Sequence, residues 1–597
     1  MKEEKIRVLK LSWKLLKFKP VLVFFGFLSD ILFFLTPLML SLIIREIFNK
    51  IEHVSNFNIS IWVLILLLIP LARAFNFLAD AIFFVTMMPY VKQAQILLRK
   101  NMLVQIFSLP GAEALTDTAG ESVSRFRGDV EEAIWFTYEI TQKFSIAVFA
   151  GFSFLVMQKI NWQVTAYLSI PFTIMIFLVL FSKKKIIELR KTRRKAAGAV
   201  TRAIGEIYHS IQAIKITNSE ERVLRYFDSI NEKRRKAEIK DELFVAILNS
   251  IYRITVSVGI GIVLYIVGNS LTNNTFTIGD LALFVGILNS LADFIWDIGD
   301  FIPRYLRTKV SYSRIFKLVR GRKRESYQKI EEKLVNYGPV YINKSYTSQK
   351  SDLNENYGTL QKLIVRNLTY IFPDSNKGIE NVSFEIERGT LTVLTGRVGS
   401  GKTTLLRTLL GLYDKQSGEI SWNNKKIEDC SSFFIPPRTA YTPQVPHLFS
   451  DTIKENILLG LEENNIEIEK ALKLAVLEDE IKKFEKKSET LIGPKGVKLS
   501  GGQKQRLATA RMFARKSDLY IFDDLSSALD VKTEQELWRR IFSYKEMTCF
   551  AVSHRKMMLK KADKIILLKD GKIEQIGKLD ELLTKSEEMQ RIWKGEI

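Results

Sequence analysis

The sequence predicts an α-helical transmembrane domain of six spans followed by an α/β domain of the phosphate-loop type. Two observations support this fold class. The 597-residue chain is strongly apolar up to about Phe301 and polar beyond it, although its mean hydropathy is only +0.03. A β-rich run, a glycine-rich loop and a helix-like segment then follow one another from 390 to 413. Because this length exceeds that of an ordinary domain, we expect at least two folding units.

The charge distribution favours a membrane rather than nucleic acid as the partner. The formal net charge is +23, and Lys and Arg concentrate beside the apolar segments, as in "KKKIIELRKTRRK" at 183–195. That arrangement is typical of the cytoplasmic side of membrane proteins. The two cysteines, Cys430 and Cys549, lack the spacing of a disulfide framework or a zinc site. We therefore expect a lipid bilayer as partner, no nucleic acid, and a cytoplasmic second half.

Six apolar segments are each near or above the roughly 20 residues that cross a bilayer. The predicted spans are Val21–Ile44, Ile59–Met88, Ile134–Met157, Trp162–Phe181, Leu243–Leu271 and Ile278–Ile302. The positive-inside rule places the basic segments at 1–19, 91–130, 183–240 and after 303 in the cytoplasm. Apolar residues recur at helical spacing in the two long internal loops, so we expect the membrane helices to continue beyond the bilayer.

Several charged residues lie inside the predicted spans, and such residues are candidates for function. They are Asp30, Arg73, Asp80, Arg253, Asp293, Asp297 and Asp300, of which the last three share one helical face. Two interpretations of this aspartate trio are equally open. Either it lines a substrate path and favours a cationic or amphipathic cargo, or it is hydrated near the cytoplasmic end and paired with Arg304 and Arg307.

A charged segment at 321–358 without sustained periodicity is expected to be a linker. It separates a transmembrane domain at 1–320, with its long cytoplasmic loops, from a nucleotide-binding domain at 359–597.

The second domain carries a phosphate-loop motif in the required context, with the β-rich "TLTVLTG" before "GRVGSGKTT" and a helix-like run after it. The glycines let backbone N–H groups face phosphate oxygens, Lys402 supplies a positive charge, and Thr403 can ligate Mg²⁺. The predicted contacts to ATP are Gly396, Arg397, Val398, Gly399, Ser400, Gly401, Lys402, Thr403 and Thr404.

Two adjacent carboxylates end the apolar run of "LYIFDDLSSALD", Leu519–Asp530. This strand is expected to bring Asp523 to the same sheet edge as the phosphate loop, where a carboxylate can hold Mg²⁺. Asp524 is then the candidate general base for an attacking water.

A further segment, "LSGGQKQR" at 499–506, provides a second helix start at which glycine N–H groups are presented. The combination of motifs resembles the ATPase domain of ABC transporters. In that family, "LSGGQ" closes over the γ phosphate held by the other domain of a head-to-tail dimer. The resemblance therefore assigns Ser500, Gly501, Gly502 and Gln503 to nucleotide binding across a dimer.

The same resemblance extends to other residues. Gln444 in "YTPQ" is similar to the glutamine near Mg²⁺, and His554 in "FAVSHR" to the histidine that contacts the γ phosphate. Asp530 resembles the family's dimer-loop aspartate. Phe372 before "PD" resembles the residue that stacks on adenine, with Tyr370 as an open alternative. The segments at 118–131 and 210–222 are similar to the two coupling segments of the membrane domain.

Asp524 departs from the family pattern, in which this position is usually glutamate. The intrinsic pKa values of Asp and Glu are similar, about 3.9 and 4.3, so reach rather than basicity differs. The missing methylene withdraws the carboxylate by roughly 1 to 1.5 Å, and misplacement on that scale can lower the rate about 100-fold. Two hypotheses follow: a homodimer with two slow aspartate sites, or pairing with a second half-transporter that supplies a glutamate.

Six spans before one ATPase domain resemble an exporter-type half-transporter. The resemblance implies ATP-driven export of an amphipathic lipid, peptide or drug-like small molecule by alternating access, with ATP and Mg²⁺ as cofactors. It also implies a dimer, formed with itself or with a second half-transporter, in the cell membrane. The alternatives are an importer of the same fold and an ATP-gated channel or receptor.

Overall fold

The computed structural model describes residues 7–52, 59–109, 111, 119–271, 276–320, 326–338, 357–372, 375–462, 467–493, 496, 498–525, 528–544 and 546–596. The chain forms two compact units, Met1–Gln105 with Asp117–Ile342, and Ile106–Thr116 with Asn343–Ile597.

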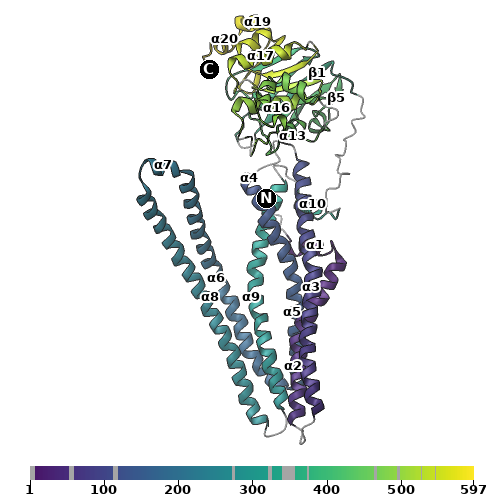
Figure 1. Cartoon of the computed structure of the whole chain (residues 1–597), viewed down its shortest axis with the longest axis vertical. Coiled ribbons are helices and arrows are strands. Elements are labelled where there is room, and N and C mark those ends of the chain that lie inside the picture. Colours follow the sequence, from purple (N-terminus) through teal and green to yellow (C-terminus); the bar gives the residue numbers. More distant parts are fainter. Residues whose placement is uncertain are drawn as a thin grey trace. The chain divides into compact units, whose positions relative to one another are not determined.

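The first unit is helical, and each predicted span lies within one long helix (Figure 1). The six long helices are α2 (Pro20–Glu52), α3 (Ile59–Phe107), α5 (Val130–Ile160), α6 (Trp162–His209), α8 (Glu220–Leu271) and α9 (Ile278–Arg320). The shorter helices are α1 (Val8–Leu16), α4 (Ala119–Ser124), the π-helix η1 (Arg125–Asp129), α7 (Ile211–Ile216) and α10 (Tyr327–Leu334).

Within the described residues, three helices are long and apolar enough to cross a membrane: Pro20–Glu52, Leu67–Phe107 and Gly120–Ile160. The other three predicted spans contain residues whose side chains lie outside the described set. The helices also run well past the predicted spans, because the polar segments that follow keep helical periodicity.

Local signals explain how the chain reverses between these helices. Asn161 separates α5 from α6, and its side-chain oxygen accepts hydrogen bonds from the backbone N–H groups of Gln163 and Val164, each at 3.1 Å. At the other end, α7 joins α6 to α8, and these two helices pack against each other along their length (Figure 1).

The charged residues of the spans are only partly described. The backbone of Asp293, Asp297 and Asp300 belongs to α9, but their side chains lie outside the described residues, as does that of Arg253. The two interpretations of the aspartate trio therefore both stay predictions.

The second unit contains two sheets. The antiparallel sheet has the order β2-β1-β4-β5, with β1 at Lys362–Ile371, β2 at Gly378–Glu387, β4 at Ser417–Trp422 and β5 at Lys425–Lys426. The other sheet has the order β10-β9-β3-β8-β7-β6, with β3 at Leu391–Thr395, β6 at Thr439–Thr442, β7 at Leu519–Asp523, β8 at Thr548–Val552, β9 at Lys564–Lys569 and β10 at Lys572–Gly577. Strands β9, β3, β8, β7 and β6 are mutually parallel, so their carboxyl ends share one edge.

The described residues of this unit form two hydrophobic cores. One contains residues of β7 and α16, and the other lies between the two sheets. The unit also contains eleven helices among the described residues. They are α11 (Lys402–Leu409), α12 (Cys430–Phe433), α13 (Ile453–Leu458), α14 (Ile468–Leu474), α15 (Glu478–Lys482), η3 (Lys487–Glu489), α16 (Gly501–Phe513), α17 (Val531–Phe542), α18 (Lys556–Lys561), α19 (Leu579–Lys585) and α20 (Glu587–Lys594). The fully buried β3 and β7 thus place the loops that follow them at one sheet edge.

Candidate nucleotide site

A cavity of about 440 Å³ lies at the carboxyl ends of β3 and β7. The predicted residues that line it are Phe372, Gly396, Val398, Gly399, Gly401, Lys402, Thr403, Thr404, Gln444, Asp523, Asp524 and His554. Lys377, Gly378 and Val552 also line it and were not predicted. The volume lies within the range of ordinary small-molecule sites.

The phosphate loop has a backbone that requires glycine. Gly396, Gly399 and Gly401 have φ values of +149°, +84° and +102°, which side-chain-bearing residues rarely adopt. A Cβ on Gly396 would also lie 2.2 Å from the backbone oxygen of Leu568 in β9. The loop is thereby packed against the sheet and leads directly into α11.

Lys402 is turned toward its own loop. Its Nζ donates hydrogen bonds to the carbonyl oxygens of Gly396, at 2.7 Å, and Arg397, at 2.6 Å. Burial lowers the pKa of Lys402, against the opposing effect of Asp524 and Asp523. Because the ammonium group is partly desolvated, its electrostatic attraction for an anion bound in the loop is stronger than it would be in water.

Asp523 is 1% exposed and is held by two hydroxyl groups. Thr403 Oγ1 donates to its Oδ1 and the Tyr441 hydroxyl to its Oδ2, both at 3.3 Å. Burial raises the pKa of Asp523. Mg²⁺ in nucleotide sites uses one or two protein ligands together with phosphate oxygens, and the Thr403 and Asp523 oxygens fit that requirement.

Asp524 is hydrogen-bonded to Gln444. Gln444 Nε2 donates to Asp524 Oδ2 at 3.2 Å, and the backbone N–H of Asp524 donates to Val552 at 3.2 Å. Its other carboxylate oxygen is buried and has no hydrogen-bond partner among the described residues. Asp524 has a φ of +50°, a left-handed conformation that Asp and Asn tolerate better than most residues.

The structure separates the two candidate stacking residues. Phe372 lines the cavity. Tyr370 is 4% exposed and stacks on Tyr413, with ring centroids 4.7 Å apart and an interplanar angle of 12°. Tyr370 therefore belongs to the core behind Phe372, which it contacts edge-on at 5.1 Å.

The "LSGGQ" segment forms the start of α16. Ser500 Oγ accepts from the backbone N–H of Gln503 at 3.3 Å, and Gln503 Oε1 accepts from that of Ser500 at 2.9 Å, which is a capping box. Gly501 and Gly502 make the first turn of the helix. None of these four residues is among the described residues that line the cavity. Asp530 caps α17 by accepting from the Thr533 N–H at 3.0 Å.

Two contacts of the site were not predicted. Tyr441 lies in the quoted "YTPQ", yet nothing in that sequence assigned its hydroxyl to Asp523. The side chain of Arg397, a residue of the phosphate loop, pairs with Glu588 of α20. Neither contact has a local sequence signal, because the partners are far apart along the chain.

Family comparisons agree with both halves. Residues 20–292 match the ABC transporter transmembrane region, and residues 379–527 match the ABC transporter family's ATPase model.

The similar proteins include two groups that are named for different cargoes. The chain is 27% identical to an ATP-dependent lipid A-core flippase of Photobacterium profundum over 492 residues, which are 81% of this chain and 80% of that protein. It is 27% identical to the mitochondrial iron-sulfur clusters transporter ATM1 of Candida glabrata over 437 residues, which are 72% of this chain and 57% of that protein.

A solved structure has the same fold over nearly the whole chain. It is that of a bacterial Atm1-family ABC exporter with ATP bound, with a TM-score of 0.76 and 19% identity, covering 97% of this chain and 99% of that one.

Proposed function

Because this chain belongs to the ABC transporter family as an exporter-type half-transporter, we propose that it uses ATP to export an anionic amphipathic molecule. It is an integral membrane protein with one transmembrane region and one ATPase domain, and its relatives are ATP-dependent transporters. The two groups of relatives are named for different cargoes, so the choice of cargo rests on this chain's own residues.

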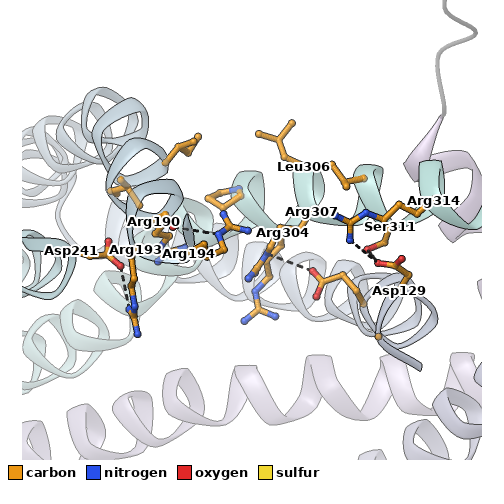
Figure 2. Close-up of a pocket in the computed structure, with 16 residues that line it drawn as sticks. Asp129, Arg190, Arg193, Arg194, Asp241, Arg304, Leu306, Arg307, Ser311 and Arg314 are labelled. Carbon is orange, nitrogen blue, oxygen red and sulfur yellow. Dashed lines mark hydrogen bonds and ion pairs between the residues drawn. The ribbon is translucent and has the colours of Figure 1, made fainter. Parts of the chain in front are cut away.

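The observation that carries the proposal is a cavity of about 880 Å³ in the first unit, between η1, α5, α6, α8 and α9 (Figure 2). Six arginines line it: Arg190, Arg193, Arg194, Arg304, Arg307 and Arg314. Three carboxylates, those of Asp129, Glu132 and Asp241, also line it. These nine side chains alone have a formal excess of three positive charges, which is reduced by Glu139, paired with Arg304, and by Glu238, paired with Arg193.

Ion pairs hold part of this lining in place. Arg193 contacts Asp241 at 3.2 Å, and Asp241 is 3% exposed. Arg314 approaches Asp129 at 3.6 Å, while Arg307 approaches Glu132 at the same distance. These pairs fix the guanidinium groups around the cavity, and a lining so rich in arginine favours an anionic ligand because guanidinium groups donate paired hydrogen bonds to phosphate and carboxylate oxygens.

The apolar part of the lining completes the chemistry. Ile186, Ile187, Pro303, Leu306 and Val310 line the same cavity, and Leu306 and Val310 are 42% and 49% exposed. A ligand with a phosphate or carboxylate head and an apolar body would contact both kinds of side chain. A cationic cargo, which the predicted aspartate trio would favour, would be repelled by the positive charge of this lining.

Stimulation of ATP hydrolysis by charged amphiphiles tests the cargo class. Dodecyl phosphate and dodecyltrimethylammonium would be added at low concentration to the chain reconstituted in neutral lipid. We expect dodecyl phosphate to stimulate hydrolysis, and Arg194→Gln and Arg307→Gln each to raise its half-stimulating concentration about tenfold or more, since a charge-assisted hydrogen bond is lost. Lys191→Gln, an exposed neighbour on α6, is the matched control.

Equal stimulation by the ammonium compound, or dodecyl phosphate stimulation that both arginine variants leave unchanged, would contradict the proposal. Unchanged basal hydrolysis in all three variants separates the cargo site from the ATPase site.

On the nucleotide side, we assign the loop from Gly396 to Thr404 to the phosphates of ATP and Phe372 to the adenine ring. Mg²⁺, when bound, neutralises charge on the phosphates, and Thr403, Asp523 and Gln444 are the residues to hold it. Asp524 orients and deprotonates the attacking water, and His554 contacts the γ phosphate. Asp524 Oδ1 accepts no hydrogen bond from the described residues, so this oxygen is available to accept a proton from the water.

We further propose a homodimer. The cavity lining of one chain does not include Ser500, Gly501, Gly502 and Gln503, which supports a second copy as the source of the "LSGGQ" segment at each site. Native mass spectrometry of the purified protein should give a dimer of the 68.8 kDa chain. A monomer that hydrolyses ATP at the full rate would contradict this assembly.

The predicted division at 1–320, 321–358 and 359–597 is part of the same proposal, as is a location in the cell membrane with the ATPase domain in the cytoplasm. The basic segments beside the spans support this orientation.

A further inference from the structure

The C-terminal helix α20 is fixed to the ATPase domain along one face. Met589 and Ile592, 0% and 4% exposed, belong to the same hydrophobic core as β7 and α16. Ser586 caps the helix by accepting from the Met589 N–H at 3.1 Å. Trp593 lies under the ammonium groups of Lys556 and Lys560, which are 5.3 and 5.7 Å from its ring centre. The position of α20 is therefore set by its packing against the hydrophobic core of the ATPase domain and not by contacts with the nucleotide site.

This helix carries a buried carboxylate at its first turn. Glu588 is 3% exposed, whereas its neighbour Glu587 is exposed. An ionised carboxylate in such a position is unfavourable unless it is paired. Its ion-pair partner is the guanidinium of Arg397, whose side chain is 46% exposed. Arg397 is the second residue of the phosphate loop.

The backbone of Arg397 is also hydrogen-bonded to the phosphate-loop lysine, Lys402. The Arg397 carbonyl accepts from Lys402 Nζ at 2.6 Å and from the Ser400 N–H at 3.2 Å. The Gly571 N–H, in the turn between β9 and β10, donates to the Ser400 carbonyl at 3.0 Å. The loop is thus tied to the C-terminal part of the domain through a side chain of α20 and a backbone group of the turn.

We propose that Glu588 is a positioning residue for the phosphate loop, holding Arg397 so that the loop keeps the shape that receives ATP. A loop that is already ordered loses less conformational freedom on binding and so binds more tightly. The helix then contributes to ATP affinity without contacting the nucleotide. This role concerns the loop and is independent of the cargo proposed above.

The test is the affinity of the full chain for a fluorescent ATP analogue, mant-ATP, together with the ATPase rate at saturating ATP. We expect Glu588→Gln to raise Kd about tenfold, or about 1.4 kcal/mol, through loss of the ion pair with Arg397, and to change kcat less than twofold. Glu587→Gln is the matched control and should change neither. Arg397→Gln should weaken binding by a similar factor, and the double variant should be no weaker than either single variant.

Three results would overturn the proposal. A lower melting temperature of Glu588→Gln with unchanged Kd would mean that the pair only stabilises the fold. Tighter binding of mant-ATP by Glu588→Gln would mean that Glu588 restrains an arginine that acts directly on the phosphates. Independent, multiplying effects of the two single variants would mean that the residues do not act through each other.

Discussion

The ATPase rate of Asp524 variants is the prediction that most depends on the structure. Asp524→Asn removes the basic oxygen and retains the side-chain shape. The backbone at this position has a φ of +50°, which Asn adopts as readily as Asp, so the fold should be unchanged. We expect kcat to fall at least about 100-fold, the lower end for loss of a general base, while ATP affinity stays the same.

Asp524→Glu tests whether the carboxylate of Asp524 is too short to contact the attacking water. The longer side chain extends the carboxylate by roughly 1 to 1.5 Å, and a correction on that scale can raise the rate by up to about 100-fold, or about 2.7 kcal/mol in the barrier. The gain will be smaller if the contact from Gln444, now 3.2 Å long, must be broken. We therefore expect an intermediate increase over the native chain.

The assay is phosphate release by the chain alone in lipid, with Asp570→Asn as control. Asp570 also has a left-handed backbone, with a φ of +47°, but it is exposed and does not line the cavity. Native-like hydrolysis by Asp524→Asn would refute the assignment of the base. A native chain no faster than Asp524→Asn, with activity restored by Glu, would refute the homodimer and direct the search to a partner chain with a glutamate.

Three further predictions follow from burial and packing. Asp523→Asn should abolish Mg²⁺-dependent hydrolysis. It should also stabilise the nucleotide-free protein by about 1 kcal/mol, or roughly 2 to 4 °C in Tm. The reason is that burial raises the pKa of the Asp523 carboxyl and so disfavours its charged form. The stability gap should close as the pH falls toward 3.8, where the native carboxyl also becomes neutral, and a gap that widens in acid would contradict the reasoning. Phe372→Ala should weaken ATP binding up to about tenfold and lower Tm less than Tyr370→Ala does, because Phe372 is only partly buried against the core. The reverse pattern in binding and melting curves would exchange the roles of the two residues. Gly279→Ala should destabilise the first unit by about 1 to 3 kcal/mol, because the new Cβ would lie 2.2 Å from an asparagine oxygen and 2.3 Å from a carbonyl oxygen of α2. Gly261→Ala, whose new Cβ would have no atom of the described residues within 4 Å, should not destabilise it. Equal thermal stability of the two variants would show that α2 and α9 do not pack closely.

The sequence predicts the core of the nucleotide site because its residues obey local rules. The phosphate loop is continuous, and a buried strand ending in Asp523 is expected at the same edge as β3 in a parallel sheet. Long apolar segments likewise predict the membrane helices, since a bilayer fixes their length.

Contacts between distant segments could not be predicted in the same way. The segment at 183–195 is basic in sequence, but only the packing of α6 against α9 brings Arg190 and Arg307 to one cavity. The pairing of Arg397 with Glu588 likewise depends on where α20 packs. Phe372 and Tyr370 are two residues apart, and the sequence does not show which of them faces the site. The structure distinguishes them because Tyr370 stacks on Tyr413 in the core, whereas Phe372 lines the cavity.

ATP-driven movement of an anionic amphiphile by this chain alone is the decisive test of the proposed export function. Proteoliposomes with outward-facing ATPase domains would be given a fluorescent alkyl phosphate and ATP. We predict accumulation inside the vesicles that requires ATP, is abolished by Asp524→Asn and is weakened by Arg194→Gln. No accumulation, or accumulation that persists in Asp524→Asn, would contradict the account.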